Sequence, residues 1–163
     1  MPRMMTVVLE NQIEELRVLT QMLQAFLRPC ELPSRTQYAL ELSLEEIFVN
    51  IISYAYEDNR RHAIHFDVDV DDDMIAMKFS DDGRPFNPLA VKTPDPQNPL
   101  MERVMGGLGI SFVRHMRDMM EYQRQDERNV LRIWFQRKTD TPPEPETDGS
   151  AKGTPNGQTP QGT

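Results

Sequence analysis

The first residues with chemical potential are a glutamate and an asparagine four positions apart, Glu46 and Asn50. Residues four apart lie on the same face of a helix, so a carboxylate and a carboxamide would project together. An amide oxygen is a hard ligand that suits Mg²⁺, and a carboxylate beside it could accept a proton from an attacking hydroxyl. Taken alone, the pair also fits an ordinary solvated helix face, together with Glu41 and Glu45.

A second polar group stands at the end of a predicted strand, in the sequence Ser80-Asp81-Asp82-Gly83. A buried aspartate at a strand end can accept a hydrogen bond from an exocyclic amine. A glycine two residues later lets the backbone approach a flat ring closely. A plain turn would use the same residues, because Asp-Gly is common in turns.

Glycines open a predicted helix in Gly106-Gly107-Leu108-Gly109-Ile110. Free backbone N–H groups and the helix dipole favour phosphate at such a helix start without a basic side chain. The motif comes too late in the chain for a dinucleotide-binding GxGxxG, and the sequence has no GxxxxGK[ST] of a P-loop. A flexible turn before a helix would also carry these glycines.

The elements that must position these residues follow from the periodicity of apolar side chains. Asn11 is expected to cap a first helix that ends at Pro29, with Ile13 on its apolar face, and Ser34 with Gln37 to form a capping box on a second helix that runs to about Tyr56. Strands are expected at 5–9, 64–70, 75–79, 122–124 and 130–135, with a long loop from Gly83 to about Arg103. The pattern predicts an α/β two-layer sandwich, a mixed, mostly antiparallel sheet with helices on one face.

Composition narrows the class of protein. The chain has 163 residues, a net charge of −8 and one cysteine, Cys30, which we expect to be buried near a helix end. The acidic balance disfavours direct nucleic-acid binding. The sequence shows neither a membrane span nor a signal peptide, so we expect a cytoplasmic protein. One domain is expected over 1–138, and the Pro-, Gly- and Thr-rich segment 139–163 is expected to be a disordered tail.

The order of the three motifs resembles the N, G1 and G2 boxes of the Bergerat-fold ATP-binding superfamily, which includes gyrase, heat-shock chaperones and sensor histidine kinases. The phrase LEEIFVNIISYAY, and the pairing of DDGRPFNP with GGLGISFVRHM, are most similar to the anti-sigma-factor serine/threonine kinases. The resemblance covers about Thr6 to Lys138. It implies ATP and Mg²⁺ as cofactors.

The resemblance also implies roles for individual residues. Asn50 would coordinate the Mg²⁺ that bridges the ATP phosphates, and Glu46 would be the general base. Glu45 is five residues from Asn50 and therefore lies about 140° away around the helix, which favours Glu46 for the role. Asp81 would contact the adenine amino group, and Gly83 would let the ring sit close. The phosphates would be held by Gly107, Leu108 and Gly109, beneath a short ATP lid over about 88–105.

The implied activity is a serine/threonine protein kinase that phosphorylates an anti-sigma-factor antagonist of the STAS type, with a sigma factor as a second expected partner. Many relatives carry a histidine soon after the asparagine, where this chain has Ser53-Tyr54-Ala55, and some carry an arginine at the position of Met105. These departures concern phosphoryl transfer more than ATP binding. They keep a second hypothesis open, a nucleotide-gated protein-binding module with little catalysis. A third is a structural domain whose glycines are only turns. Relatives often form homodimers, which is therefore a plausible state here.

Overall fold

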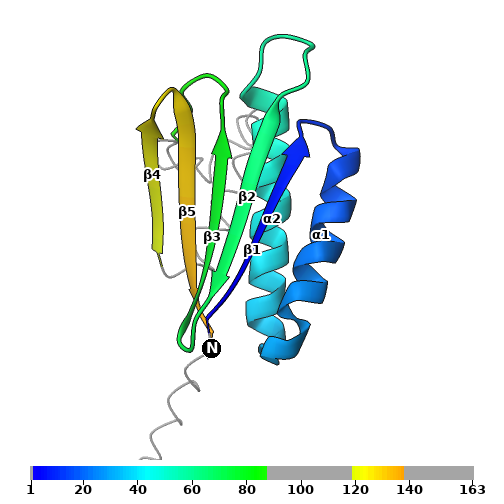
Figure 1. Cartoon of the computed structure of the whole chain (residues 1–163), viewed down its shortest axis with the longest axis vertical. Coiled ribbons are helices and arrows are strands. Elements are labelled where there is room, and N and C mark those ends of the chain that lie inside the picture. Colours follow the sequence, from blue (N-terminus) through cyan, green and yellow to red (C-terminus); the bar gives the residue numbers. More distant parts are fainter. Residues whose placement is uncertain (1, 88–118, 138–163) are drawn as a thin grey trace, which may run out of the picture.

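The computed structural model describes residues 2–87 and 119–137. In this part of the chain, a single sheet carries two helices on one of its faces (Figure 1). Three sequence predictions lie outside the described residues: the phosphate-binding residues Gly107, Leu108 and Gly109, the lid over 88–105, and the tail over 139–163.

The sheet has five described strands, and every pairing among them is antiparallel. Their order across the sheet is β1-β2-β3-β5-β4. The strands are β1 (Arg3–Glu10), β2 (Ala63–Val70), β3 (Met74–Asp81), β4 (Met119–Gln125) and β5 (Arg128–Gln136). The predicted α/β two-layer sandwich is confirmed, with a sheet that is antiparallel throughout its described strands rather than mixed.

The core lies between this sheet and the helices α1 (Glu14–Leu27) and α2 (Ser34–Tyr54). Alternate residues of each strand face the helices, because side chains along a strand point to opposite faces. Phe66 on β2 and Phe79 on β3 meet here with their ring centroids 5.0 Å apart. The helices contribute residues at helical spacing: Leu19, Leu23 and Leu27 from α1, and Leu40, Leu44, Ile47, Phe48 and Ile51 from α2.

The opposite face of the sheet has a polar central row, with apolar residues such as Met4 and Val8 exposed on either side of it. This row crosses all five strands in register as Thr6, Asp67, Lys78, Arg132 and Glu121. The Lys78 ammonium lies 2.8 Å from Asp67, and the Arg132 guanidinium lies 3.6 Å from Glu121. Cross-strand pairs of opposite charge stabilise a solvated face. The alternation of apolar and charged residues in β2 and β3 therefore has a direct physical reason.

Two predicted helix caps are wrong, although the second helix begins close to the predicted residue. Asn11 does not cap α1: its side chain donates to the carbonyl oxygen of Arg60 at 3.2 Å and accepts from the backbone N–H of His62 at 2.9 Å. The pairing of β1 with β2 holds Asn11 in this place, and the helix begins at Glu14, which leaves Ile13 52% exposed instead of packed. The second cap fails because Pro33 occupies the cap position and Ser34 is already helical, without a side-chain capping bond.

The end of the first helix is close to the prediction. The α-helix stops at Leu27, and the chain continues through Pro29 as one 3₁₀ turn, η1 (Arg28–Cys30). Cys30 is buried at this turn, as predicted. Within residues 2–87 and 119–137, neither helix has the length and apolarity that crossing a membrane requires.

Candidate functional site

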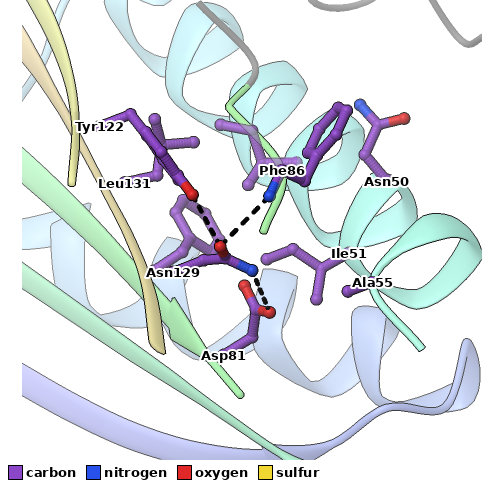
Figure 2. Close-up of a pocket in the computed structure, with 10 residues that line it drawn as sticks. Asn50, Ile51, Ala55, Asp81, Phe86, Tyr122, Asn129 and Leu131 are labelled. Atoms are coloured by element: carbon purple, nitrogen blue, oxygen red, sulfur yellow. Dashed lines mark hydrogen bonds between the residues drawn. The ribbon is translucent and has the colours of Figure 1, made fainter. Parts of the chain in front are cut away.

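A pocket lies between α2 and the sheet, where β3 ends (Figure 2). Its walls are mostly apolar, and three buried polar side chains face it from different elements: Asn50 from α2, Asp81 from β3 and Asn129 from β5. An apolar pocket with a few converging polar groups is typical of a small-molecule site. The apolar lining residues are Ile47, Ile51, Ala55, Phe79, Phe86 and Leu131, with Tyr122 beside them.

Asp81 is the last residue of β3 and is only 4% exposed. The Oδ1 atom accepts two hydrogen bonds, from Asn129 Nδ2 at 2.8 Å and from the backbone N–H of Gly83 at 2.9 Å. Both of these donors reach the same oxygen. Burial raises the pKa of the Asp81 carboxyl, although these two hydrogen bonds oppose the rise. The carboxyl is thus held in one orientation in a place where its charge is costly.

Steric crowding explains why position 83 is a glycine. A Cβ atom at this position would lie 2.5 Å from the Ala55 Cβ and 2.6 Å from the Ala55 carbonyl oxygen. The next residue, Arg84, donates its backbone N–H to this same carbonyl at 2.8 Å. Gly83 therefore lets the turn after β3 pack directly on the end of α2. The closely packed ring that we expect at Gly83 stays a prediction.

Asn50 is 6% exposed, and its Nδ2 atom has no hydrogen-bond partner in the described part of the chain. A buried amide group without a partner costs about 1–3 kcal/mol. The same face of α2 places Ile47 and Ile51 against the pocket, so the amide lies along its wall. This loss of stability at a pocket wall would be offset if a bound ligand accepted a hydrogen bond from the Asn50 amide.

Glu46 lies one turn before Asn50 and is half-buried, whereas Glu45 is exposed. This is the register that the sequence predicts. Burial raises the pKa of the Glu46 carboxyl, and the negative charge of Glu45 adds to the rise. A carboxylate with a raised pKa is a better proton acceptor, so Glu46 has the property that a general base needs.

Asn129 is a polar residue of the pocket that the sequence analysis missed. It stands opposite Asp81 in the pairing of β3 with β5 and is 4% exposed. A signal was present, because Asn129 extends the inward alternation of Leu131, Ile133 and Phe135 by one step. The predicted strand began at Val130, so Asn129 was not counted among its inward-facing residues.

The chemical types of the described side chains suit a nucleotide with a magnesium ion. Asp81 supplies an acceptor for an amino group, the apolar walls suit a flat base, and the Oδ1 atom of Asn50 is the kind of oxygen that a hard cation binds. The Asn50 Nδ2 atom, which has no partner among the described residues, is a donor that a phosphate oxygen or water could accept from. Within residues 2–87 and 119–137, no cluster of three or more acidic, histidine or cysteine side chains could hold a metal. A magnesium ion here would therefore be held by Asn50 together with phosphate oxygens and water.

Comparison with known families decides the class of this site. A family model described as the histidine kinase-like ATPase domain matches residues 9–135. The chain belongs to this family. The match spans Glu46, Asn50 and Asp81 together with Asn129. No curated protein matches the chain.

As a histidine kinase-like ATPase domain, the chain binds ATP, and its chemistry is phosphotransfer or ATP hydrolysis. The free space of the pocket, about 30 Å³, holds no more than a water molecule or two. A purine therefore needs more room than these walls leave in the present arrangement. Phe86 borders the pocket and is only partly buried, on the segment that follows β3.

The unpartnered Asn50 amide leads to a first prediction. Asn50→Leu keeps the size of the side chain and removes the amide, so the free energy of unfolding without nucleotide should be unchanged or higher by about 1 kcal/mol. The affinity for ATP with Mg²⁺ should fall steeply, as measured by calorimetry. The control is Ser43→Ala on the same helix, where the buried hydroxyl does have a partner, the Ala39 carbonyl at 2.7 Å. A clear loss of stability in Asn50→Leu would contradict the prediction.

His62 joins two acidic residues beside the ATP site. Its Nε2 lies 2.7 Å from Asp58 Oδ1 and its Nδ1 lies 3.2 Å from Asp82 Oδ1, while its ring stacks on Tyr56 with centroids 4.2 Å apart. Both ring nitrogens can donate only when the imidazole is protonated. The hydrogen bond with Asp58 is the main reason why the pKa of His62 is raised above its usual 6.5.

A second prediction follows for the pH dependence of stability. Because the folded pKa of His62 is raised, its contribution is complete below the unfolded value of 6.5 and is lost as pH rises through the folded pKa. His62→Gln should therefore lower stability at acidic pH and flatten the fall of the unfolding free energy above 6.5, as measured by urea unfolding at several pH values. His65→Gln on β2 controls for the loss of a histidine. Parallel profiles for wild type and His62→Gln would refute the role of the two carboxylates.

Proposed function

We propose that this ATPase domain is a serine/threonine protein kinase that phosphorylates an anti-sigma-factor antagonist of the STAS type. The observation that carries the proposal is the pairing of Glu46, a half-buried carboxyl with a raised pKa, with the unpartnered amide of Asn50 one turn later on α2. Asn50 borders the ATP pocket and its amide oxygen is a hard-cation ligand, and Glu46 lies one helical turn away as a candidate base. Transfer to a hydroxyl needs these two groups near each other.

In the proposed reaction, Asp81 accepts a hydrogen bond from the adenine amino group and thereby orients the adenine ring. Asn50 would hold a magnesium ion through its amide oxygen, and this ion would supply neutralising charge for the phosphate oxygens. Glu46 takes the proton from the serine or threonine hydroxyl. The hydroxyl oxygen forms a bond to the γ-phosphorus, and the bond from this phosphorus to ADP breaks. Positioning and charge neutralisation supply most of the catalysis in phosphoryl transfer, so this small set suffices. Gly107, Leu108 and Gly109 are proposed to hold the phosphates.

A second candidate function is a nucleotide-gated module that binds a partner protein with little catalysis. The residue that favours it is Met105, at a position where some relatives carry an arginine that reaches the terminal phosphate. We propose the cytoplasm as the location for either function, with the antagonist as partner and a sigma factor as a second candidate partner. A homodimer is one candidate assembly.

One experiment separates the two candidates. The wild-type chain is incubated with γ-labelled ATP, Mg²⁺ and a STAS-type antagonist domain. Label that appears on a serine or threonine of the antagonist supports the kinase. Tight nucleotide binding without transferred label, together with nucleotide-dependent binding of the antagonist, would favour the module instead.

A further inference from the structure

The side chain of Asn129 makes five hydrogen bonds inside the ATP site, and Figure 2 shows those with Asp81, Tyr122 and Phe86. Its Nδ2 donates to Asp81 Oδ1 at 2.8 Å and to the Arg84 carbonyl oxygen at 2.9 Å. Its Oδ1 accepts from the Tyr122 hydroxyl at 2.8 Å, from Arg124 Nη1 at 3.0 Å and from the backbone N–H of Phe86 at 3.3 Å. One amide therefore links the polar end of the pocket to the backbone that carries its aromatic wall.

These five bonds also fix which way the amide faces. A flipped Asn129 would turn its NH₂ group toward the donors of Tyr122 and Arg124, and its oxygen toward the Asp81 carboxylate. Only the contact with the Tyr122 hydroxyl, which can also accept, would re-form, and Asn129 is 4% exposed. The Asn129 amide is thus rigid, and it holds the Asp81 carboxyl and the Phe86 backbone in one geometry.

We infer that Asn129 is a positioning residue that sets the base selectivity of the site, through Asp81 and the backbone of Phe86. The inference rests on the nucleotide site described above and goes beyond the proposed reaction. Asn129 and Gly83 both donate to Asp81 Oδ1, so Oδ2 is the oxygen left for a ligand. An adenine presents an amino group to this acceptor, whereas a guanine presents a carbonyl oxygen at the same ring position and would be repelled.

The selectivity depends on Asp81 keeping this orientation. If the donor on Asn129 is lost, the carboxyl can rotate, and Oδ2 is no longer held where the adenine amino group would reach it. The Phe86 backbone N–H is held by the acceptor Oδ1 of Asn129, which remains when only the donor is lost, so the expected change is confined to the orientation of Asp81. Affinity for ATP and discrimination against GTP should therefore fall together.

The sharpest test is Asn129→Asp, which keeps the shape of the side chain and replaces the donor to Asp81 with a second carboxylate oxygen. At near-neutral pH the variant should bind ATP about tenfold more weakly or worse, with a reduced ATP-to-GTP affinity ratio. Two carboxyls in contact share a proton as pH falls, which restores a donor to Asp81 Oδ1. The ATP affinity of the variant should therefore recover toward about pH 5, whereas that of the wild type should not rise.

The charged and titratable groups around Asp81 are few among the described residues. Asp82 raises its pKa and Arg128 on β5 lowers it, while the Tyr56 phenol faces it from the end of α2. Arg124 and the Tyr122 phenol on β4 contact the Asn129 side chain itself. All five groups are retained in Asn129→Asp. A recovery at low pH that appears only in this variant is accordingly assigned to the new pair of carboxyls, and a merely structural role of Asn129 would not produce it.

Calorimetry with ATP and GTP at several pH values gives the readout. Gln125→Glu makes the same amide-to-carboxylate change at an exposed position on β4 and should behave as wild type. If Asn129→Asp does not fold, Tyr122→Phe removes one donor to Asn129 Oδ1 and should still lower the ATP-to-GTP ratio about threefold. An unchanged ratio and pH profile in the folded variant overturns the inference. Wild-type protein that binds no ATP would instead overturn the proposed function.

Discussion

Asp81→Asn is expected to weaken ATP binding about 10- to 100-fold and to leave the folded protein at least as stable as wild type. The new side chain keeps an oxygen that can accept from Asn129 and Gly83, so the turn after β3 is preserved. Its NH₂ group would then face the adenine amino group, which places two donors against each other. A buried donor without an acceptor accounts for the expected loss.

The stability part of this prediction follows from the sign of the pKa shift. Burial raises the folded pKa of Asp81 above its usual 3.8, so the ionised carboxylate destabilises the folded state at every pH above that range. Replacement by a neutral amide removes this cost. Thermal unfolding without nucleotide measures stability, and calorimetry measures affinity. Asp82→Asn is the control, because Asp82 is exposed and lies next to Asp81 in the chain.

Two results would contradict the assignment of Asp81. Unchanged ATP affinity in Asp81→Asn would remove the adenine contact. A large loss of stability would instead mark Asp81 as a structural residue, held by Asn129 for the sake of the turn. An equal loss of affinity in Asp82→Asn would indicate a general effect of charge near the pocket.

Glu46→Gln is expected to lower phosphoryl transfer about 10²- to 10⁴-fold while nucleotide affinity stays close to that of wild type. The amide keeps the shape of the side chain but cannot accept the proton of the substrate hydroxyl. Because burial raises the pKa of Glu46, the wild-type transfer rate should rise with pH through that raised pKa, and the variant should lose this rise. The assay is single-turnover transfer of label from ATP to the antagonist domain.

The matched control is Glu45→Gln, which makes the same change on the exposed side of α2. It should lower the pKa of Glu46 slightly, because one neighbouring negative charge is lost, and leave the transfer rate within about threefold of wild type. If Glu45→Gln abolishes transfer and Glu46→Gln does not, the assignment of the base is wrong. If neither variant affects transfer, neither glutamate accepts the proton of the substrate hydroxyl.

The sequence alone predicted those features of the fold that depend on neighbours along the chain. The alternation in β2 and β3 gave the inner face of the sheet, and the helical spacing from Leu40 to Ile51 gave the buried face of α2. The same spacing placed Glu46 and Asn50 on one side and Glu45 on the other. These predictions succeed because the period of a helix or a strand is fixed by its backbone geometry.

Contacts between distant segments were decided only by the tertiary structure. The pairing of β3 with β5 brings Asn129 to Asp81, which lies 48 residues away along the chain, and no local pattern gives that register. The packing of Gly83 on Ala55 and the capture of Asn11 by the backbone before β2 are of the same kind. Asn11 shows the reason most clearly: a side chain that could cap its own helix forms instead the hydrogen bonds that the neighbouring strand makes available. The local sequence determines which hydrogen bonds a side chain is able to form. The packing of the whole chain determines which partner it forms them with.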